Sequence, residues 1–327
     1  MDQRGPLQPH LRAEFQGNPD WAAVHEATYG AVPGPVHINQ PFDEPLLDGE
    51  FALVPQTLVP KRPLVVEHLE LEGKGFVFAG PNAPPIEAPV PIIHDGLAQG
   101  RTGDVATDLP EADWVVHIGG APTNKAWSQQ LNRHPNRIRV GRRQWDEADP
   151  TWVDADAVTM EASPWTLKQQ PQPPTTPEGV ALANIAGELF VGNSLAVRQW
   201  DRVGNRRAWA NRGVSGIDGN IATAAGLSLA GPITAVIGDL TFQHDVGSLA
   251  LCKGRNVRIV VLNNNGGRIF EHLPVASEPE FEELFVTPQC FRVEDAAKAF
   301  GLSYQACAPD RVGLATAQVV EVRIDHP

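Results

Sequence analysis

The sequence predicts an α/β protein with doubly wound parallel sheets, and three observations lead to this fold class. Short β-branched runs alternate with helical patterns over the last part of the chain, which indicates strand–helix–strand units. Polar turns follow these runs, and the Gly- and Ala-rich helical patterns suit close packing of a helix on a sheet. Ligands of such sheets bind beyond the carboxyl ends of the strands, so the polar turns are candidate sites.

The alternation is clearest over residues 188–327, which we predict to form the last domain. Its expected strands cover residues 188–194, 232–238 and 257–263, where each apolar run leads into a turn. Its expected helices cover residues 195–203, 215–231, 244–252 and 293–301, and the last of them ends at a glycine.

Three further segments precede this domain. "QQPQPPTTPEG" has the Pro-rich composition of a semi-rigid linker, and we predict a linker with a short helix over residues 169–187. A softer break over residues 45–63 separates a first segment, residues 1–46, from a central segment, residues 47–168. The central segment has a weaker alternation, in which "GFVFAG" and "DWVVHIGG" are strand-like and "NKAWSQQL" is helical. We predict a supporting α/β domain there.

The composition disfavours several classes of protein. The chain has 327 residues, of which 42% are hydrophobic and 20% are charged, so a globular protein with room for two domains is expected. No apolar run is long enough to span a bilayer, and the first residues lack the pattern of a signal peptide. The net charge of −13 disfavours nucleic acids and anionic membranes as partners, so an anionic substrate needs a local arginine cluster.

The cysteines indicate the compartment. Cys252, Cys290 and Cys307 are odd in number and form no Cys-x-x-Cys pair. This pattern argues against a disulfide framework or a zinc site, and it predicts a reducing, cytoplasmic location.

Two predicted strand ends carry residues that suit a metal ion. "AVIGDLTFQHD" places Asp239 directly after one strand, and "RIVVLNNNGGRIF" places three Asn and two Gly after the next. Asp239 and Asn264 are 25 residues apart (264 − 239), which fits one helix and one strand, so both can end adjacent parallel strands. A carboxylate, an Asn side-chain oxygen and a backbone carbonyl are hard oxygen ligands of the kind that Mg²⁺ prefers.

The same turns suit a diphosphate. Mg²⁺ usually takes its remaining ligands from phosphates and water, and a helix opening after Asp239 can offer free N–H groups to phosphate oxygens. Gly266 and Gly267 let the backbone approach a ligand closely. Taken singly, a Gly-Asp pair is more often a turn or a helix cap, and an Asn-Gly pair is more often a turn. Together they predict a site for a magnesium diphosphate.

In this order and at this spacing, the motifs resemble the thiamine-diphosphate signature, a Gly-Asp pair followed after about 25 residues by Asn-Asn. Four stretches, "LFVGNSLAVR", "NRGVSGIDGNIATAAG", "GDLTFQHD" and "NNNGGRIFEHLP", resemble one family of that superfamily. This is the 2-succinyl-5-enolpyruvyl-6-hydroxy-3-cyclohexene-1-carboxylate synthase (MenD) family of menaquinone and phylloquinone biosynthesis. "GPVHINQPFDEPL" and "GGAPTNKAW" match the same family, so the resemblance covers most of the chain.

The resemblance implies a transferase that uses thiamine diphosphate with Mg²⁺, or with Mn²⁺ in its place. It implies decarboxylation of 2-oxoglutarate and addition of the succinyl-semialdehyde unit to isochorismate, with the cofactor as electron sink. In this superfamily the cofactor lies between two chains, so a homodimer or homotetramer is implied. Two alternatives remain: another thiamine-diphosphate carboligase with a different acceptor, and a non-catalytic cofactor-binding remnant.

The resemblance also implies roles for individual residues. The implied metal ligands are Asp239, Asn264 and the carbonyl group of Gly266, and Ile217 matches the bulky side chain that supports the bent cofactor. The implied cofactor-binding residues are Gly192, Ser194, Ile217, Gly238, Leu240, Thr241, Gly267 and Ile269. The implied substrate-binding residues are Asn193, Arg198, Arg212 and Phe270.

The two arginines also have a case of their own. Arg198 and Arg212 follow predicted strand-end turns on the ligand side of the sheet. Each offers a planar fork of donors that suits a carboxylate, and both implied substrates carry two carboxylates. The alternative is that each is a surface arginine paired with Asp201 or Asp218.

Two other residues of the last domain are predicted to lie outside the site. A lone histidine in the first turn of a helix, such as His244, is more often structural than catalytic. Arg206 lies in the polar stretch "GNRR" and is predicted to have no role. We therefore leave both residues out of the predicted site.

The family pattern is incomplete in this chain. The family has three domains, and the first carries the Glu that activates the cofactor. "GPVHINQPFDEPL", which closes that domain, begins here at residue 34, so residues 1–46 correspond to its tail. No catalytic residue is therefore assigned in this chain, and a separate pyrimidine-binding domain is an expected partner. Residues 308–318 are also too few for the full crossover helix of the family.

Overall fold

The computed structural model describes residues 11–30, 33–41, 64–101, 108–141, 152–168 and 173–324. The chain forms two compact units, of which the first comprises Met1–Leu71 and Ile138–Glu161 and the second comprises Glu72–Arg137 and Ala162–Pro327. The predicted division into segments 1–46, 47–168, 169–187 and 188–327 stays a prediction, and its softer boundary at residues 45–63 lies outside the described residues.

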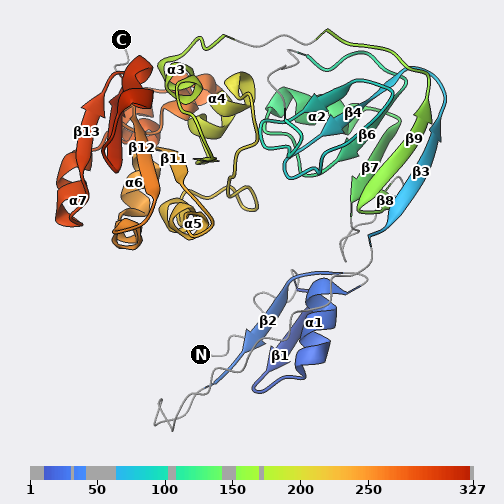
Figure 1. Ribbon diagram of the computed structural model, residues 1–327, viewed down its shortest axis with the longest axis horizontal. Coiled ribbons are helices and arrows are strands. Elements are labelled where there is room, and N and C mark those ends of the chain that lie inside the picture. The colour runs from blue at the N-terminus through green and yellow to red at the C-terminus, as the bar shows by residue number, and fades with distance from the viewer. Residues whose placement is uncertain are drawn as a thin grey trace. The chain divides into compact units, whose positions relative to one another are not determined.

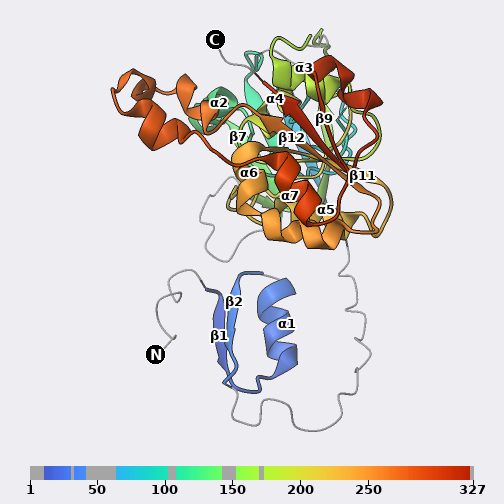
Figure 2. The same cartoon turned by 90° about the vertical axis from the view of Figure 1, so that its left-hand side faces the viewer.

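The first unit contains short strand pairs. β1 (Ala13–Gln16) pairs in parallel with β2 (Val36–Asn39), and α1 (Trp21–Tyr29) connects the two and lies beside them (Figure 2). Asp20 caps α1, because its side chain accepts a hydrogen bond from the N–H of Ala22. The remaining pairs are β7 (Arg137–Gly141) with β8 (Trp152–Asp154), which are parallel, and β3 (Val66–Leu71) with β9 (Ala157–Ala162).

The second unit contains the strands predicted from "GFVFAG" and "DWVVHIGG". β4 (Gly75–Ala79) lies between β5 (Ile92–His94) and β6 (Trp114–Ile118), and all three run in parallel. Asn124 caps α2 (Lys125–Arg133), because its side chain accepts hydrogen bonds from two N–H groups of the first turn. The helix is amphipathic, and its Trp127 and Leu131 are buried against Phe76 and Phe78 of β4.

The last domain is built on a five-stranded parallel sheet in the order β10-β11-β12-β14-β13. Its strands are β10 (Leu189–Val191), β11 (Ile233–Gly238), β12 (Val257–Asn263), β13 (Tyr304–Cys307) and β14 (Val319–Arg323). The three strands predicted from the sequence are β10, β11 and β12, and all three are confirmed. Their apolar residues are buried on both faces, as in other parallel sheets that are covered on both sides.

Helices cover both faces of this sheet, which is therefore doubly wound as predicted (Figure 1). On one face, Leu182 and Trp200 of α3 and α4 pack with Val236 and Val260 of the sheet. On the other face, helices α5, α6 and α7 pack on the alternate residues of the same strands. The helices are α3 (Pro177–Ala183), α4 (Leu195–Val203), α5 (Asn220–Leu227), α6 (Asp239–His244) and α7 (Val293–Ala299).

The structure corrects the helix that we expected over residues 215–231. α5 starts only at Asn220, because the residues before it form a turn in which Gly219 has a φ of 70°. The helix ends at Leu227. The turn keeps Ile217 outside the helix, on the side of the predicted site.

The helix expected over residues 244–252 begins earlier and is divided in two. α6 starts at Asp239 itself, and a 3₁₀ helix (Val246–Cys252) follows it. Asp245 separates them, and its carboxylate caps α5 by accepting hydrogen bonds from the first N–H groups of that helix, at 2.6 and 3.2 Å. Asp245, whose side chain caps α5, therefore lies at the point where the helix expected over residues 244–252 is interrupted.

The connections between the later strands are irregular. Between β12 and α7 the chain forms 3₁₀ helices at Arg268–His272 and Pro274–Ser277 and a π helix at Glu282–Val286, and this stretch projects from the sheet (Figure 2). Between β13 and β14 a 3₁₀ helix (Pro309–Leu314) makes the crossover, in agreement with the predicted lack of a full helix there. None of the helices in the described part of the chain is both long and apolar enough to cross a membrane.

Candidate functional site

A cavity of about 160 Å³ lies at the carboxyl edge of the five-stranded sheet, where β10, β11 and β12 end. Parallel strands place their carboxyl ends side by side, so residues far apart in the sequence meet there. The residues that line it are Glu178, Asn193, Ser194, Leu195, Ala196, Ile217, Gly238, Asp239, Leu240, Thr241, Leu262, Asn264, Gly266, Gly267, Ile269 and Phe270.

Most of the predicted site residues line this one cavity. The exceptions are Gly192, Arg198 and Arg212. Gly192 directly precedes Asn193, a lining residue, and a Cβ there would lie 3.0 Å from Ile237, so a side chain would press on β11. The predicted cofactor, substrate and metal residues are thus brought together by the fold, while their individual roles stay predictions.

Unusual backbone conformations gather at this edge. Ser194, which precedes α4, has a φ of 71°, a region that costs a non-glycine residue roughly 1–3 kcal/mol and is found mainly at functional sites. Gly266 has a φ of 122°, and a Cβ on it would lie 2.1 Å from the carbonyl oxygen of Val286. No residue with a side chain fits position 266 without moving the neighbouring chain.

The predicted metal donors lie together at the ends of β11 and β12. Asp239 is buried, and its Oδ2 accepts a hydrogen bond of 2.6 Å from the N–H of Gly266. Burial raises the pKa of Asp239, although the N–H groups of Gly266 and Leu240 oppose the shift. The donors comprise one carboxylate, one amide oxygen and one backbone carbonyl, a set of hard oxygen atoms that fits Mg²⁺ or Mn²⁺.

Asn264 has a neighbour that the sequence did not predict. Its Nδ2 lies 3.4 Å from Oε1 of Glu178, a buried residue of α3. Thr176 caps this helix by accepting a hydrogen bond from the N–H of Gly179, and Pro177 occupies its first turn. The Thr-Pro-Glu pattern predicts the start of a helix, but no local signal indicates that Glu178 reaches a site 86 residues further along the chain.

The two predicted substrate arginines lie next to the cavity and close to each other. Arg212 donates a hydrogen bond of 2.7 Å to Oδ1 of Asn193, and Arg198 donates one of 2.8 Å to the carbonyl oxygen of Ser194. Arg198 keeps part of its side chain exposed; burial of the rest, followed by the charge of Arg212, lowers its pKa. Because the charges of Arg198 and Arg212 repel each other, an anion bound between the two side chains is favoured.

The alternative pairing of these arginines is not what the structure contains. Within the described residues, neither Arg198 nor Arg212 forms an ion pair with Asp201 or Asp218. Asp218 instead lies 3.5 Å from His244, and both of these side chains are largely exposed and lie outside the lining of the cavity.

Arg206 is not the uninvolved surface residue that the sequence suggested. It donates hydrogen bonds of 2.8 and 2.7 Å to the carbonyl oxygens of Gly187 and Ile185, and its guanidinium lies 5.2 Å from the ring centre of Trp200. Removing it would release the turn that leads into β10. Arg202, an exposed residue of α4, is the better control.

Helix α4, which carries Arg198, also carries a buried carboxylate, Asp201, and a second buried carboxylate, Asp95, lies near it. Oδ1 of Asp201 accepts a hydrogen bond of 2.7 Å from the N–H of Gly96, and Asp95 accepts hydrogen bonds from Thr123. Arg101 lies between them and donates to the carbonyl oxygen of Asp201. Burial, followed by the charge of Asp95, raises the pKa of Asp201 to about 7.

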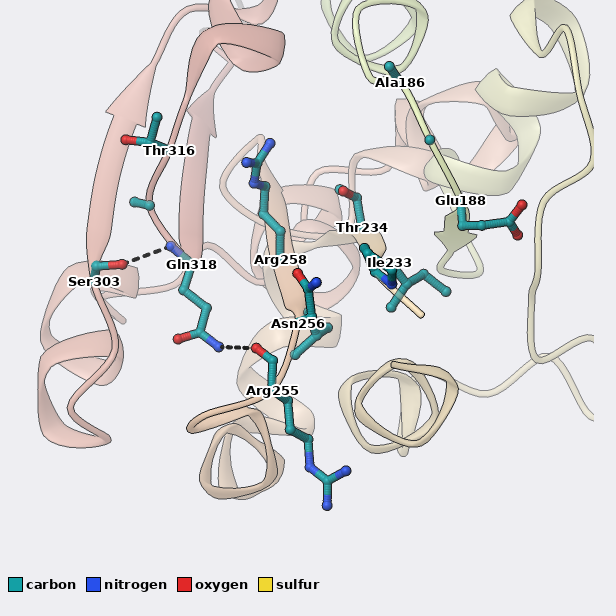
Figure 3. Close-up of a pocket in the computed structure, with 14 residues that line it drawn as sticks. Ala186, Glu188, Ile233, Thr234, Arg255, Asn256, Arg258, Ser303, Thr316 and Gln318 are labelled. Atoms are coloured by element: carbon teal, nitrogen blue, oxygen red, sulfur yellow. Dashed lines mark hydrogen bonds between the residues drawn. The ribbon is translucent and has the colours of Figure 1, made fainter. Parts of the chain in front are cut away.

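A larger cavity, of about 400 Å³, lies at the opposite, amino edge of the same sheet (Figure 3). Several of its polar groups bind one another. The N–H of Gln318 donates a hydrogen bond to Oγ of Ser303 at 2.9 Å, and Nε2 of Gln318 donates one to the carbonyl oxygen of Arg255 at 3.4 Å. Arg255 and Arg258 point in opposite directions (Figure 3). Size therefore does not identify the candidate site; the smaller cavity has the convergent chemistry.

Comparisons with known proteins agree with the placement of this site. Residues 191–323 match the family model described as "Thiamine pyrophosphate enzyme, C-terminal TPP binding domain". Over these residues the chain is similar to the C-terminal domain of thiamine pyrophosphate enzymes. The matched residues contain β11, β12, β13, β14 and the last residue of β10, together with all of the lining residues except Glu178.

Curated relatives extend the similarity to most of the chain. The 2-succinyl-5-enolpyruvyl-6-hydroxy-3-cyclohexene-1-carboxylate synthase of Roseiflexus sp. (strain RS-1) is 31% identical over 84% of this chain and 63% of the relative. The synthase of the same name from Dechloromonas aromatica (strain RCB) is 33% identical over 85% of this chain and 65% of the relative. The chain therefore spans less than two thirds of the length of these relatives.

A solved structure supports the fold. A protein isolated from Mycobacterium smegmatis and assigned as a thiamin diphosphate-dependent enzyme superimposes with a TM-score of 0.60 at 14% identity, over 98% of this chain and 77% of that one. At this identity the likeness concerns the fold alone. It confirms the predicted thiamine-diphosphate-enzyme architecture with parallel sheets.

Proposed function

We propose that this chain binds thiamine diphosphate through Mg²⁺ at the carboxyl-edge cavity and forms the diphosphate-binding part of a MenD-type synthase. One observation carries the proposal. Asp239 from the end of β11, and Asn264 and Gly266 from the end of β12, place three kinds of hard oxygen donor around one cavity beside a turn that excludes side chains. The family match of residues 191–323 supports the same cofactor.

The residues of the cavity divide the work of binding. Asp239 supplies the one carboxylate among the proposed ligands, and Asn264 and the carbonyl of Gly266 supply neutral oxygens. Gly238 and Gly267 have no side chains, so a diphosphate can approach the backbone there. Ile217 also lines the cavity, where a bulky side chain can support the cofactor. When bound, the cofactor supplies the electron sink for decarboxylation next to a carbonyl group.

The arginines support an anionic substrate. Arg198 and Arg212 concentrate positive charge beside the cavity, although the net charge of the protein is −13. A substrate carboxylate is therefore attracted to their position. The relatives' name identifies a synthase of a succinylated cyclohexene carboxylate. On this basis we propose 2-oxoglutarate and isochorismate as substrates, with Asn193 fixing the orientation of Arg212 through their hydrogen bond.

The rest of the proposal concerns the assembly. We infer at least a homodimer, because cofactors of this superfamily lie between two chains, and a pyrimidine-binding domain as the second half of the site. The cysteine pattern supports a cytoplasmic location. The competing candidates are a thiamine-diphosphate carboligase with another acceptor and a cofactor-binding protein without turnover.

Calorimetric titration of the 327-residue chain tests the cofactor. We expect thiamine diphosphate to bind in the presence of Mg²⁺ and not in the presence of EDTA, because the diphosphate needs the ion to approach Asp239. Thiamine monophosphate should bind far more weakly, since it offers the ion fewer oxygens. Equal binding with and without the ion would remove the metal from the proposal, and no binding of thiamine diphosphate at all would end it.

Turnover separates the remaining candidates. Formation of CO₂ from 2-oxoglutarate by the chain, with a pyrimidine-binding domain supplied, is expected from a synthase and from no remnant. Release of CO₂ without a product when isochorismate is added would favour a carboligase with another acceptor.

A further inference from the structure

Glu178 lies in the cavity without a role in the binding scheme described so far. It comes from α3, which precedes β10, and it is 5% exposed. A buried carboxylate is costly unless it is hydrogen-bonded or lies near positive charge. In the described part of the chain, its one hydrogen-bond donor is Nδ2 of Asn264, at 3.4 Å. The side-chain contact of Glu178 is thus with a proposed metal ligand.

This contact decides which way the amide of Asn264 faces. A side-chain amide carries a donor on one arm and an acceptor on the other, and its orientation follows from its partners. A carboxylate accepts hydrogen bonds and does not donate them, so the NH₂ group of Asn264 must face Glu178. The Oδ1 atom on the other arm of the planar amide is then left for the cavity that Asn264 lines.

Asp239 is fixed in a comparable way. Its Oδ2 accepts the N–H of Gly266 at 2.6 Å, so Oδ1 is the arm directed away from this contact. Each of the two side-chain ligands therefore has one arm held by the protein and one arm directed away from that contact. Such second contacts orient metal ligands and raise the affinity of metal sites.

We propose that Glu178 is a positioning residue for the divalent ion, which it serves by holding the side chain of Asn264 with its amide oxygen toward the ion. The proposal rests on the proposed binding of thiamine diphosphate with Mg²⁺. Without Glu178, the amide of Asn264 can turn its NH₂ group toward the ion.

The test compares three variants of the full chain in two measurements, the Mg²⁺ dependence of thiamine diphosphate binding and the melting temperature without ion or cofactor. Glu178→Leu removes the acceptor at similar volume, and we expect its Mg²⁺ affinity to fall roughly ten- to a hundred-fold. Glu178→Gln keeps an acceptor for Asn264 but removes the charge, so its loss should be smaller. Glu188→Leu, an exposed glutamate at the start of β10, is the matched control and should bind as the parent does.

A double-mutant cycle shows whether Glu178 acts through Asn264. Asn264→Ala should itself weaken Mg²⁺-dependent binding, and adding Glu178→Leu to it should cause little further loss. A residue that only stabilises the fold would instead lower the melting temperature without ion and would weaken binding by the same factor in both backgrounds.

Each outcome has a distinct meaning. If the parent binds the cofactor and Glu178→Leu and Glu178→Gln bind it equally well, Glu178 has no positioning role, while the proposed function stands. If Glu178→Leu costs the same factor with and without Asn264, the path through Asn264 is wrong. If the parent itself does not bind thiamine diphosphate with Mg²⁺, the proposed function fails, and this proposal fails with it.

Discussion

The two edges of the five-stranded sheet are made from the same strands but differ in what their cavities offer a ligand. At the amino edge the cavity is the larger, yet Gln318 ties the ends of two strands together and the two arginines diverge (Figure 3). At the carboxyl edge the cavity is small, and Ser194 and Gly266 hold conformations that favour function over stability. Of the residues lining the amino-edge cavity, the one with positive φ is a glycine, Gly187.

This difference indicates that convergence of polar groups marks a site better than volume does. A parallel sheet directs its strand ends, and the turns after them, toward one line at its carboxyl edge. Substitutions at that edge should therefore change ligand binding, and matched substitutions at the amino edge should change stability alone. The experiments below apply this rule to pairs of residues, beginning with the largest expected effect.

The largest effect is expected for Asp239→Ala. The variant leaves only neutral oxygens among the proposed ligands, too little charge to offset the dehydration of Mg²⁺. Calorimetry should therefore detect no thiamine diphosphate binding at Mg²⁺ concentrations that saturate the parent. Glu188→Ala, which removes a carboxylate from the amino-edge cavity, should leave binding unchanged. Unaltered affinity of Asp239→Ala would refute the metal assignment.

Arg198→Ala and Arg212→Ala should affect substrate and spare the cofactor. Loss of one partner of a desolvated charge pair typically costs about 2–5 kcal/mol, which corresponds to a fall of roughly thirty- to several-thousand-fold in kcat/KM. The measurement is turnover of 2-oxoglutarate with a pyrimidine-binding domain supplied, alongside calorimetry of the cofactor. If cofactor affinity falls in step with turnover, the arginines belong to the diphosphate site.

Two further arginines serve as controls for this experiment. Arg202→Ala changes an exposed residue on the same helix as Arg198, and Arg258→Ala changes one that lines the amino-edge cavity. Both variants should turn over substrate as the parent does. A loss in Arg258→Ala as large as that in Arg198→Ala would contradict the distinction between the two edges.

Gly266→Ala and Gly254→Ala compare two glycines with positive φ. At Gly266 the added Cβ lies 2.1 Å from a carbonyl oxygen, whereas at Gly254, which precedes β12, nothing lies within 4 Å. The left-handed conformation alone costs alanine about 1–2 kcal/mol, so both variants should be less stable to urea. Only Gly266→Ala should also lose cofactor affinity, by about ten-fold or more, because its turn must move to relieve the clash. Equal affinities in the two variants would show that the turn tolerates displacement.

The smallest expected effect is on the pH dependence of stability and concerns Asp201, a buried residue of α4. The pKa of Asp201 is raised from its ordinary value of 3.8 to about 7, so the folded state holds its proton over a pH range in which the unfolded state has lost it. Its contribution to the free energy of unfolding is therefore full below pH 3.8, declines as the pH rises, and is lost above about 7. Between pH 5.5 and 7.5 the parent should lose roughly 1–2 kcal/mol more than Asp201→Asn.

This measurement must be the difference between parent and variant. Burial, followed by the charge of Arg101, lowers the pKa of nearby His94 to about 4, so His94 gives a stability contribution that rises with pH, opposite to that of Asp201. Urea titrations of both proteins at the two pH values cancel the part due to His94, and the difference reports the titration of Asp201 together with its effect on Asp95. Parallel pH profiles would mean that Asp201 is ionised throughout this range.

The sequence was sufficient for features that depend on short stretches of chain. β10, β11 and β12, of three, six and seven residues, follow from short apolar runs, and the parallel fold follows from their alternation with helices. Asp239 and Asn264 could be placed at one edge from the sequence alone, because each directly follows a strand. The boundaries of α5 and α6 could not, since the side chain of Asp245 caps the helix that begins 25 residues before it (245 − 220).

Only the tertiary structure decided the contacts that hold the site in place. Glu178 meets Asn264 across 86 residues, and Asp201 meets Gly96 across 105. Arg206, which looked like a surface residue, binds two carbonyl oxygens of the turn before β10. These contacts depend on how helices pack on the sheet, where the burial of many side chains sets the geometry. A strand end is a local property of the chain, but the residue that comes to lie beside it is fixed only by the packing of the whole domain.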